Sequence, residues 1–536
     1  MTPVWKLDHA QVRGTPFEPG RHRDVIVVGA GITGLATALM LARHGFDVAV
    51  VEAGEVGQLA TGANTGKVSL LQGSVLSTLR RHHPARLVRA YVDANRDGAD
   101  WLVGFAEEAG VPYSRRTALS YAQTGAGVSC VEAELSAAAE AGLPVRRVEP
   151  EHLTGAPFPV ADAVALDGQA AIDPQRLALA LAQAFLAAGG TLHTGVRVIR
   201  VHAVPTAWVG TDAGSASADR VVLATAAPIT DRGLYFAKTR GLRSSCVAFT
   251  VPSPVPEGLY LSVDGATKSI RSITAADGPA DTAQLIVGGN GHPVGRAPSP
   301  RACLDDLVSW TQRHFPGAEP VAEWSAQDYQ SHDLIPFVGA MPRGLGRIRF
   351  ATGYAKWGLS NGPAAALRLS AEIRKVPWRD RPEWMTTIAT RMTVPADLAR
   401  GGVENLRVGW EAASGWIGAQ AVPSPVRRPA DGEGVVANRA GHPVGISTVD
   451  GTTRAVSAIC THLGGVLTWN DAERSWDCPL HASRFAPDGT RIEGPAVCDL
   501  ARLPRVPGEE IEDAEEVAAE RSATSPRAAA GARLTS

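Results

Sequence analysis

Residues 24–52 read DVIVVGAGITGLATALMLARHGFDVAVVE. Asp24–Val28 is a short apolar run rich in β-branched residues, which is typical of a buried parallel strand. Three glycines follow at once in the spacing G-x-G-x-x-G, namely Gly29, Gly31 and Gly34. The pattern over 35–44 predicts a helix, and the run 48–51 predicts a second strand. The stretch therefore predicts one strand–helix–strand unit of a doubly wound, Rossmann-like α/β sheet.

The glycine spacing suits a dinucleotide. The first glycine makes the tight turn, the second lets the backbone approach a pyrophosphate, and the third packs the helix onto the strand. Glu52 ends the second predicted strand, 18 residues after Gly34, where a carboxylate accepts the ribose hydroxyls of adenosine. These features together predict a dinucleotide site. The fingerprint alone is compatible with either FAD or NAD.

A second cofactor pattern lies near the C-terminus. The segment C-T-H-L-G-G begins at Cys460 and the segment C-P-L-H-A-S begins at Cys478, so each offers one thiolate and one imidazole. The four candidate metal ligands are Cys460, His462, Cys478 and His481. Two thiolates on one iron and two imidazoles on the other form the ligand set of a Rieske [2Fe–2S] centre. A Cys2His2 zinc site is the alternative, but zinc fingers usually group Cys with Cys and His with His.

Residues 405–506, with both ligand segments in order, resemble a Rieske domain, which is a small all-β module. High-potential Rieske proteins carry an extra Cys in each ligand segment, and the two are joined as a disulfide. The resemblance places Gly465 and Leu480 at those positions. We therefore expect no disulfide between the two segments.

Two further positions differ from the common Rieske pattern. Ala482 stands where a Gly is common, and Phe485 stands where high-potential proteins have a Tyr that donates to a cluster ligand. Ser483 is retained as a donor to a bridging sulfide. Because such hydrogen bonds tune the potential, the resemblance implies a value toward the low side of the Rieske range of about −150 to +300 mV.

Residues 24–375 resemble the superfamily of D-amino-acid oxidase, glycine oxidase and sarcosine oxidase. The resemblance implies FAD rather than NAD. We expect the FAD to be bound non-covalently, because the flavin-bound Cys of some sarcosine oxidases has no counterpart. It also implies a substrate domain inserted into the nucleotide-binding fold. The segments that carry it are Ala60–Lys67, Thr194–Val198, Val221–Ala226, Asp333–Gly339 and Gly353–Gly362.

In this superfamily the glycine fingerprint and these segments surround the flavin. The resemblance therefore implies the following FAD-binding residues: Gly29, Gly31, Ile32, Thr33, Gly34, Glu52, Ala53, Thr61, Asn64, Thr65, Lys67, Val198, Ala224, Thr225, Gly353, Trp357, Gly358, Ser360, Asn361 and Gly362. The turn before residue 358 leads into an Ala/Leu-rich helix, whose N-terminal N–H groups would face the flavin.

The order of the two resemblances is similar to that of bacterial FAD-dependent oxidoreductases with a C-terminal Rieske domain. It predicts an α/β flavin domain with an inserted α+β substrate domain, followed by the all-β module. The predicted boundaries are an N-terminal extension at 1–23, the flavin domain at 24–375 with insertions near 75–165 and 235–330, a linker at 376–404, the Rieske domain at 405–506 and a disordered tail at 507–536.

Four residues are weak candidates for the substrate site. Lys67 could approach the flavin, with pairing to a surface carboxylate as the alternative. Tyr354 and Trp357 could wall the substrate pocket, with ordinary packing as the alternative. Arg243 could clamp a carboxylate, although an arginine at a strand end often only covers apolar surface. No catalytic acid or base is assigned, because the flavin performs the chemistry and the protein orients the substrate.

Composition excludes several classes of function. The formal net charge is −2, from 52 basic and 54 acidic residues, with no basic block, so nucleic acid is not an expected partner. Residues 1–23 do not resemble a signal peptide, and six cysteines do not form a disulfide framework. The apolar stretch 24–42 approaches membrane-span length but contains the glycine fingerprint. We therefore expect a soluble, cytoplasmic protein.

Two other patterns limit the function further. No His follows His481 and no suitable paired-His motif is present, which excludes an oxygenase with a mononuclear iron. Gly288–His292 reads GGNGH and predicts a turn that leaves a strand rather than a second nucleotide site. This weakens the case for a dedicated NAD(P)H domain.

These observations favour an enzyme that oxidises a small molecule, expected to be an amine or an amino-acid-like compound, at the flavin. Electrons would then pass singly to the cluster and on to a redox partner protein or small acceptor. One alternative reverses the flow, so that NAD(P)H reduces the flavin and the cluster feeds a separate oxygenase. Another is a non-enzymatic redox sensor.

Overall fold

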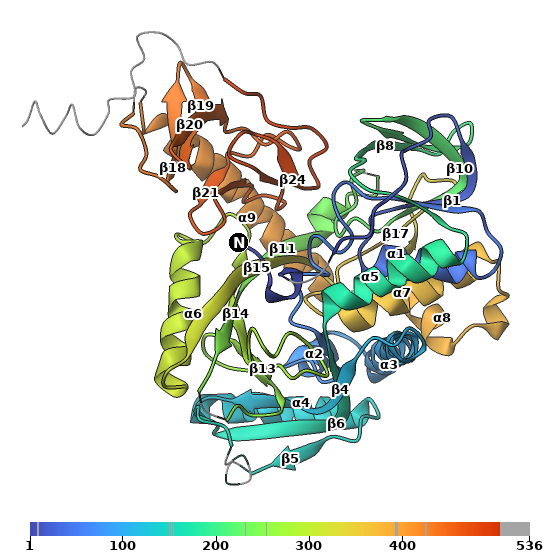
Figure 1. Ribbon diagram of the computed structural model, residues 1–536, viewed down its shortest axis with the longest axis vertical. Coiled ribbons are helices and arrows are strands. Elements are labelled where there is room, and N and C mark those ends of the chain that lie inside the picture. The colour runs from blue at the N-terminus through green and yellow to red at the C-terminus, as the bar shows by residue number, and fades with distance from the viewer. Residues whose placement is uncertain are drawn as a thin grey trace, which may run out of the picture. The chain divides into compact units, whose positions relative to one another are not determined.

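The computed structural model describes residues 1–503 apart from 8–9, 150, 152, 154, 231, 253, 392–394 and 424–425. The chain forms two compact units (Figure 1). The N-terminal unit consists of residues 1–294 and 300–405, and the C-terminal unit consists of residues 295–299 and the chain from 406 onward. The predicted disordered tail, 507–536, lies outside the described residues.

A mostly parallel sheet of the N-terminal unit has the strand order β16-β17-β10-β1-β2-β7. The pairs of β1 with β2 and β10, of β10 with β17 and of β2 with β7 are parallel. Its strands are β1 (His22–Val28), β2 (Val48–Val51), β7 (Thr191–His193), β10 (Gly214–Leu223), β16 (Phe337–Ala340) and β17 (Ile348–Thr352), and β10 also pairs with β9 (Ala207–Thr211), which pairs with β8 (Val198–His202).

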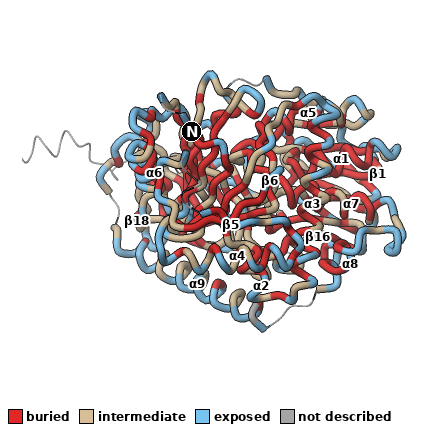
Figure 2. Tube along the Cα trace, turned by 90° about the horizontal axis from the view of Figure 1, so that it is seen from below, coloured by how far each residue is buried: buried red, intermediate tan, exposed pale blue. Residues whose placement is uncertain are grey.

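The apolar run of β1 serves both faces of this sheet, and its strands and helices are mostly buried (Figure 2). Val25 and Val27 belong to the core beneath the helices, whereas Ile26 and Val28 belong to the core shared with β8 and β9. The helices that pack on the first face and lie side by side in Figure 1 are α1 (Ile32–Ala42), α5 (Pro174–Ala187) and α7 (Gly358–Ile373). The predicted α/β class is confirmed.

A second, mostly antiparallel sheet has the order β15-β11-β14-β13-β12-β4-β6-β3, with β5 paired to β6. Its strands are β3 (Lys67–Val68), β4 (Tyr113–Ala122), β5 (Arg146–Val148), β6 (Asp162–Ile172), β11 (Thr239–Thr250), β12 (Leu259–Ser262), β13 (Lys268–Ser272), β14 (Leu285–Pro293) and β15 (Glu319–Ser331). Further α-helices of this unit are α2 (Val75–His82), α3 (Ala85–Glu108), α4 (Val128–Glu140), α6 (Pro300–His314) and α8 (Glu383–Ala389).

The predicted turn at Gly288–His292 is wrong, because β14 continues through it to Pro293. The glycines are needed for close packing of the strand. A Cβ atom on Gly289 would lie 2.0 Å from the carbonyl oxygen of Thr267, and one on Gly288 would lie 3.2 Å from the sulfur of Cys246. Glycine within a strand often marks such a close approach rather than a turn.

Helix α9 (Pro395–Gln420) begins in the N-terminal unit and ends in the C-terminal unit. It runs through residue 405, where the all-β module is expected to begin, and the first strand of that module, β18, begins at Gly434. The strands form two small antiparallel sheets: β18 (Gly434–Arg439), β19 (His442–Val449) and β20 (Thr452–Ser457), then β21 (Thr468–Asn470), β22 (Ser475–Asp477), β23 (Arg484–Phe485) and β24 (Arg491–Glu493). Among the described residues, no helix is both long and apolar enough to cross a membrane.

Aromatic side chains fill the core of the C-terminal unit. Trp476 and Phe485 are fully buried, and the ring of Trp469 meets that of Trp476 edge to face at 4.8 Å. Gly445 leaves room for Trp476, since a Cβ atom there would lie 2.9 Å from the indole. Both cysteines of the two ligand segments belong to this core, so the ligand segments are built on it.

The close packing of α3 on α7 gives a test of the fold. A Cβ atom on Gly98 of α3 would lie 2.1 Å from the carbonyl oxygen of Ser360 in α7. We expect Gly98→Ala to force the helices apart and to lower the free energy of unfolding by about 1–3 kcal/mol. Gly104→Ala on the same helix is the matched control, because nothing lies within 4 Å there and the change raises stability by about 0.5–1 kcal/mol. Urea unfolding of the two variants would show opposite shifts, and equal shifts would contradict the packing.

Candidate functional site

The glycine turn after β1 leaves no room for side chains. Gly29 has a φ of +106°, and a Cβ atom on it would lie 2.6 Å from the carbonyl oxygen of Ala224. A Cβ atom on Gly34 would lie 2.0 Å from the carbonyl oxygen of Gly29. Gly31 is the N-cap of α1, so the helix N-terminus opens directly onto this turn. This bare backbone at a helix N-terminus is the cradle that a pyrophosphate requires.

Glu52 lies beside the same turn at the end of β2. Its carboxylate accepts from the N–H of Ala30 at 2.7 Å and from the N–H of Gly54 at 2.8 Å, and Ala53 N–H also acts on it. Burial raises the pKa of Glu52, and these N–H groups oppose the rise. Two backbone bonds leave acceptor capacity on a carboxylate, so Glu52 can also accept ribose hydroxyls.

The loop between Glu52 and β3 is fixed to the helix N-terminus and to the second sheet. Thr61 Oγ1 accepts from the N–H of Ile32 at 3.1 Å. Asn64 Oδ1 accepts from the N–H of Gly66 at 2.7 Å, and the carbonyl oxygen of Thr65 accepts from Arg271 at 2.7 Å. The side chains of Thr61 and Asn64 therefore shape the loop that the resemblance places along the flavin.

The N-terminal segment contributes to this loop, which the sequence did not indicate. Trp5 is 1% exposed, and its indole N–H donates to the carbonyl oxygen of Asn64 at 2.8 Å. The guanidinium of Arg271 lies 5.1 Å from the Trp5 ring centroid. Lys6 Nζ donates to the carbonyl oxygen of Gln58 at 2.7 Å. A lone tryptophan in a polar segment gives no periodicity that would have predicted this role.

Val198, Ala224 and Thr225, which are predicted to bind FAD, lie at strand ends of the first sheet. Val198 is the first residue of β8 and is buried. The N–H of Ala224 donates to the carbonyl oxygen of Val28 at 2.9 Å, which extends the pairing of β10 with β1. Thr225 Oγ1 donates to the carbonyl oxygen of Ala227 at 2.7 Å. Ala226 has a φ of +60°, in the region that favours the Gly of the superfamily pattern.

The turn before α7 is strained. Ala355 and Lys356 have φ angles of +50° and +76°, which are unusual for residues with a side chain. Asp328 of β15 holds the turn, since its Oδ2 accepts from the N–H of Lys356 at 2.5 Å. Burial raises the pKa of Asp328 to about 6, against the opposing effect of backbone N–H groups. Asp328 is a positioning residue that the sequence patterns did not reveal.

Tyr354 links the turn before α7 to the N-terminal part of α1. Its hydroxyl lies 2.9 Å from Thr33 Oγ1 in α1, and burial raises its pKa. Trp357 is the N-cap of α7, and a Cβ atom on Gly362 would lie 2.8 Å from Ile32. The N-termini of α1 and α7 therefore meet at one place, as binding of one flavin nucleotide by both would require. Gly353 has a φ of +91° and Gly358 is the first residue of α7.

Ser360 and Asn361 direct their side chains into a buried polar network. Ser360 Oγ donates to Asn95 Oδ1 at 2.6 Å, and Asn95 Nδ2 donates to Asn361 Oδ1 at 3.2 Å. Gln72 Nε2 donates to the same Asn95 oxygen, and Tyr91 OH donates to Gln72 at 2.7 Å. These side chains tie α7 to α3, and the backbone N–H groups of Ser360 and Asn361 donate to the carbonyl oxygen of Trp357, at 3.3 and 3.0 Å. Their contact with the flavin stays a prediction.

Lys67 and Arg243 are both buried in the second sheet. Lys67 Nζ donates to the carbonyl oxygen of Tyr260 at 2.8 Å and to Ser269 Oγ at 2.6 Å, so the surface-carboxylate alternative is wrong. Burial lowers the pKa of Lys67 to about 7, helped by the positive charge of Arg271. Arg243 Nη1 lies 3.4 Å from Gln327 Oε1, so it is held within the sheet.

The two ligand segments of the C-terminal unit form matching loops. In the first, the N–H of Cys460 donates to the carbonyl oxygen of Gly465 at 2.8 Å. In the second, the N–H of Cys478 donates to the carbonyl oxygen of Ser483 at 2.8 Å. Ala482 has a φ of +68°, which explains why Gly is common at that position in Rieske domains. Each loop therefore presents one Cys and one His from equivalent places.

The four candidate ligands meet in pairs of like kind. Cys460 and Cys478 are each 2% exposed. A hydrogen bond from Cys478 lowers the pKa of Cys460 to about 7, whereas the same bond and burial raise the pKa of Cys478 well above its usual range. The rings of His462 and His481 meet edge to face with centroids 5.2 Å apart. Two adjacent sulfurs and two adjacent imidazoles fit a two-iron cluster with a different pair on each iron.

The contact between the loops replaces the disulfide of high-potential proteins. A Cβ atom on Gly465 would lie 2.5 Å from Leu480 Cδ1, so the leucine occupies the space above the glycine. Ser483 Oγ accepts from the N–H of Ala496 at 2.9 Å and acts by a hydrogen bond on Cys460. Phe485 is fully buried and offers no hydroxyl.

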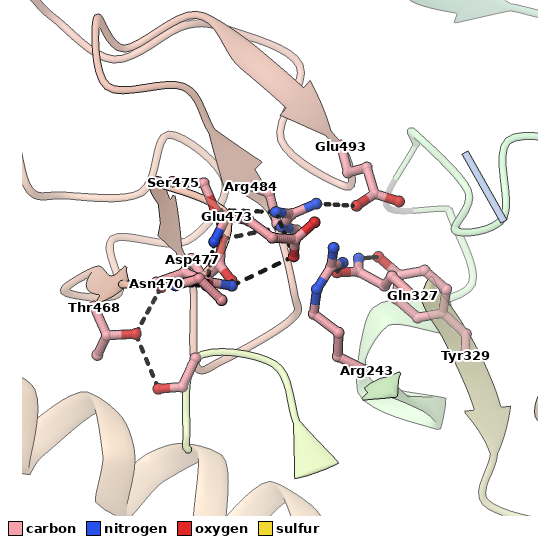
Figure 3. A network of polar contacts seen from close by, with 12 residues as sticks. Arg243, Gln327, Tyr329, Thr468, Asn470, Glu473, Ser475, Asp477, Arg484 and Glu493 are labelled. Atoms are coloured by element: carbon pink, nitrogen blue, oxygen red, sulfur yellow. Dashed lines mark hydrogen bonds and ion pairs between the residues drawn. The ribbon is translucent and has the colours of Figure 1, made fainter. Parts of the chain in front are cut away.

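A charged network surrounds Arg484, which follows the second ligand loop (Figure 3). Arg484 is 5% exposed, and its guanidinium donates at 3.0 Å to Asp477, Glu493 and Glu473. Asn470 Nδ2 donates to Asp477 at 2.9 Å. Because Asp477 precedes Cys478 and Arg484 follows Ser483, the network holds both ends of the ligand loop.

Comparisons with known proteins match both halves of the chain. The family model DAO, FAD dependent oxidoreductase, matches residues 24–372, and that of the Rieske [2Fe-2S] domain matches residues 423–504. A putative Rieske 2Fe-2S iron-sulfur protein, YhfW of Bacillus subtilis (strain 168), is 28% identical over 500 residues, which are 90% of this chain and 93% of that protein.

Solved structures share the fold of the N-terminal part. Glycine oxidase from Geobacillus kaustophilus superposes with a TM-score of 0.56 at 22% identity and covers 66% of this chain and 95% of its own. L-proline dehydrogenase from P. horikoshii superposes with a TM-score of 0.56 at 17% identity and covers 67% of this chain and 94% of its own. The expected cofactors, FAD and a Rieske [2Fe–2S] cluster, are those of the two matched families.

Asp328 gives a test of the strained turn. Its pKa in the folded protein, about 6, lies above the ordinary value of 3.8, so its contribution to stability is present at acid pH and is lost as the pH rises through about 6. Asp328→Asn removes the titratable group, although its NH2 can no longer accept one of the two backbone bonds made by the carboxylate. In flavin-free protein we expect the stability of the variant relative to the wild type to rise by up to about 3 kcal/mol between pH 4 and pH 7–8.

Thermal unfolding measured across this pH range would check the expectation. Asp281→Asn, at an exposed position, is the control. A difference between wild type and Asp328→Asn that stays constant with pH would contradict the burial of the carboxylate.

Proposed function

We propose that this chain, which belongs to the FAD dependent oxidoreductase family and carries a Rieske [2Fe-2S] domain, oxidises the C–N bond of a small amine or amino-acid-like substrate and delivers the electrons singly to a separate acceptor. The observation that carries the proposal is the presence of both cofactor sites in one chain. FAD accepts a hydride equivalent and a [2Fe–2S] cluster carries one electron at a time. An oxidase that gave its electrons directly to oxygen would need no cluster.

The chain's own residues hold the parts of this route in place. The N-termini of α1 and α7 meet through Thr33 and Tyr354 and offer backbone N–H groups to an anionic cofactor. Asp328 fixes the strained turn that leads into α7. In the other unit, Ser483 donates toward Cys460, which stabilises negative charge on the sulfur.

The substrate class rests on two supports. The proteins with the similar fold are, by name, a glycine oxidase and an L-proline dehydrogenase, which act on amino acids. The second sheet also buries polar side chains that suit a small polar substrate, among them Lys67, Arg243 and Gln327. The acceptor is a redox partner protein or a small electron acceptor. Action in the cytoplasm stays a prediction from the sequence.

An NAD(P)H-driven reductase that feeds an oxygenase is the competing hypothesis. Its expected second nucleotide site would have used Gly288–His292, but these residues lie within β14 and pair with neighbouring strands. The redox-sensor hypothesis relied on the tail at 507–536, which lies outside the described residues.

Anaerobic mixing of the protein with a panel of amines and amino acids tests the proposal. We expect one of them to bleach the flavin absorbance and then to produce the rhombic EPR signal of a reduced Rieske cluster. Cys460→Ser removes a cluster ligand, so it should keep the bleaching, lose the EPR signal and reduce ferricyanide at least about tenfold more slowly. Cys498→Ser, at an exposed cysteine outside the ligand set, is the matched control.

Other outcomes separate the hypotheses. Rapid bleaching by NAD(P)H without any amine would favour the reductase. Flavin reduction by an amine without a cluster EPR signal in the wild type would contradict transfer of single electrons from the flavin to the cluster. Firmly bound cofactors with no turnover on any donor would favour the sensor.

A further inference from the structure

A short segment from the middle of the N-terminal unit belongs to the C-terminal unit. Residues 295–299 connect β14, which ends at Pro293, with α6, which begins at Pro300, yet their contacts place them with the cluster-binding module. The chain therefore leaves the unit that contains the flavin site, contributes five residues to the module and returns. We call residues 295–299 the crossing segment.

The crossing segment has a fixed seat beside the second ligand loop. Thr468 Oγ1 donates to the carbonyl oxygen of Gly295 at 3.0 Å, and Ser299 Oγ donates to Asp471 Oδ2 at 2.5 Å. Gly295 has a φ of +69°, and a Cβ atom on it would lie 2.8 Å from the backbone nitrogen of Pro479. The backbone of the segment thus lies directly against the residue that follows the ligand Cys478.

Arg296 connects this segment to the second ligand loop by a side-chain hydrogen bond. Its side chain is 10% exposed, and its Nε–H donates to the carbonyl oxygen of Pro479 at 2.9 Å. Glu411 of α9 lies 3.9 Å from the same nitrogen and helps to orient the guanidinium. A largely covered guanidinium therefore donates to a backbone carbonyl between the two ligands of the second loop, Cys478 and His481.

The peptide group that Arg296 contacts also faces the cluster. The carbonyl of Pro479 and the N–H of Leu480 belong to one peptide unit. The N–H of Leu480, together with that of His481, donates to the Cys478 sulfur. A donor on the carbonyl oxygen polarises the peptide and strengthens the bond that its N–H donates, because hydrogen bonds in a chain reinforce one another.

We propose that Arg296 is a positioning residue that raises the reduction potential of the cluster, acting through the Pro479–Leu480 peptide on the Cys478 sulfur. Reduction adds one electron to the cluster, forms or breaks no covalent bond and increases the negative charge on the sulfurs. Stronger N–H donation stabilises that charge and so favours the reduced form. The potential of the module is then set by a residue supplied from within the flavin domain. The inference does not depend on the substrate proposed above.

An EPR-monitored redox titration of the full-length holoprotein, with dithionite as reductant and mediators, tests the inference. Arg296→Met keeps the length of the side chain and removes both the charge and the donor. At the midpoint potential of the wild type, we expect its ratio of reduced to oxidised cluster to fall by about twofold to tenfold, the range that one hydrogen bond supplies. Arg296→Lys keeps the charge without the Nε–H. We expect its ratio of reduced to oxidised cluster to lie between those of the wild type and Arg296→Met.

Ser299→Ala is the matched control, because it removes an anchor of the same segment and leaves the bond of Arg296 to Pro479 in place. We expect it to leave the ratio unchanged. If Arg296→Met binds the cluster and titrates as the wild type does, the inference is wrong. A fall in Ser299→Ala as large as that in Arg296→Met would also overturn it, because seating of the segment would then be the cause.

Arg296→Gln provides a second variant in case Arg296→Met does not retain its cluster. Its amide still donates while the charge is lost, and we expect a smaller fall in the same direction. Resonance Raman spectra give an independent readout, because a weaker hydrogen bond to Cys478 shifts the Fe–S stretching bands. Unchanged bands together with an unchanged ratio in Arg296→Gln and Arg296→Lys would refute the inference.

Discussion

The N-terminal unit depends on one place where the backbone approaches itself without intervening side chains. At the end of β1, Gly29 lies against Ala224 of the adjoining strand and against Gly34 of the helix that follows. Gly362 allows α7 to reach the same place. A methyl group at any of these glycines would meet another atom at 2.8 Å or less. The meeting of two helix N-termini, where we expect the flavin to bind, follows from this constraint.

Patterns within short stretches of sequence predicted the parts of the site that are local. The glycine turn and each ligand loop lie within a few consecutive residues, and Glu52 follows Gly34 by 18 residues, a spacing set by one strand–helix–strand unit. The role of Asp328 was not predicted, because its partner, Lys356, is 28 residues away. The strained turn escaped as well, because Ala355 and Lys356 are not the glycines that usually mark a positive φ.

The misread run at Gly288–His292 shows a general limit of such patterns. A glycine-rich run is equally consistent with a turn and with a strand that must pass close to its neighbours. Only the positions of Cys246 on the adjacent strand β11 and of Thr267, just before the adjacent strand β13, distinguish the two. The burial of Trp5 could not be predicted for the same reason, because it depends on Asn64 and Arg271, which are far along the chain.

The crossing segment also bears on how the protein is made. Its seat, around Thr468 and Pro479, is translated after roughly 170–180 further residues, which takes on the order of 10–40 s at ordinary rates of synthesis. During that interval the connection between β14 and α6 has no completed surface to rest on. Residues 295–299 therefore reach their final contacts only after the C-terminal unit has been translated, although they are synthesised between two elements of the N-terminal unit.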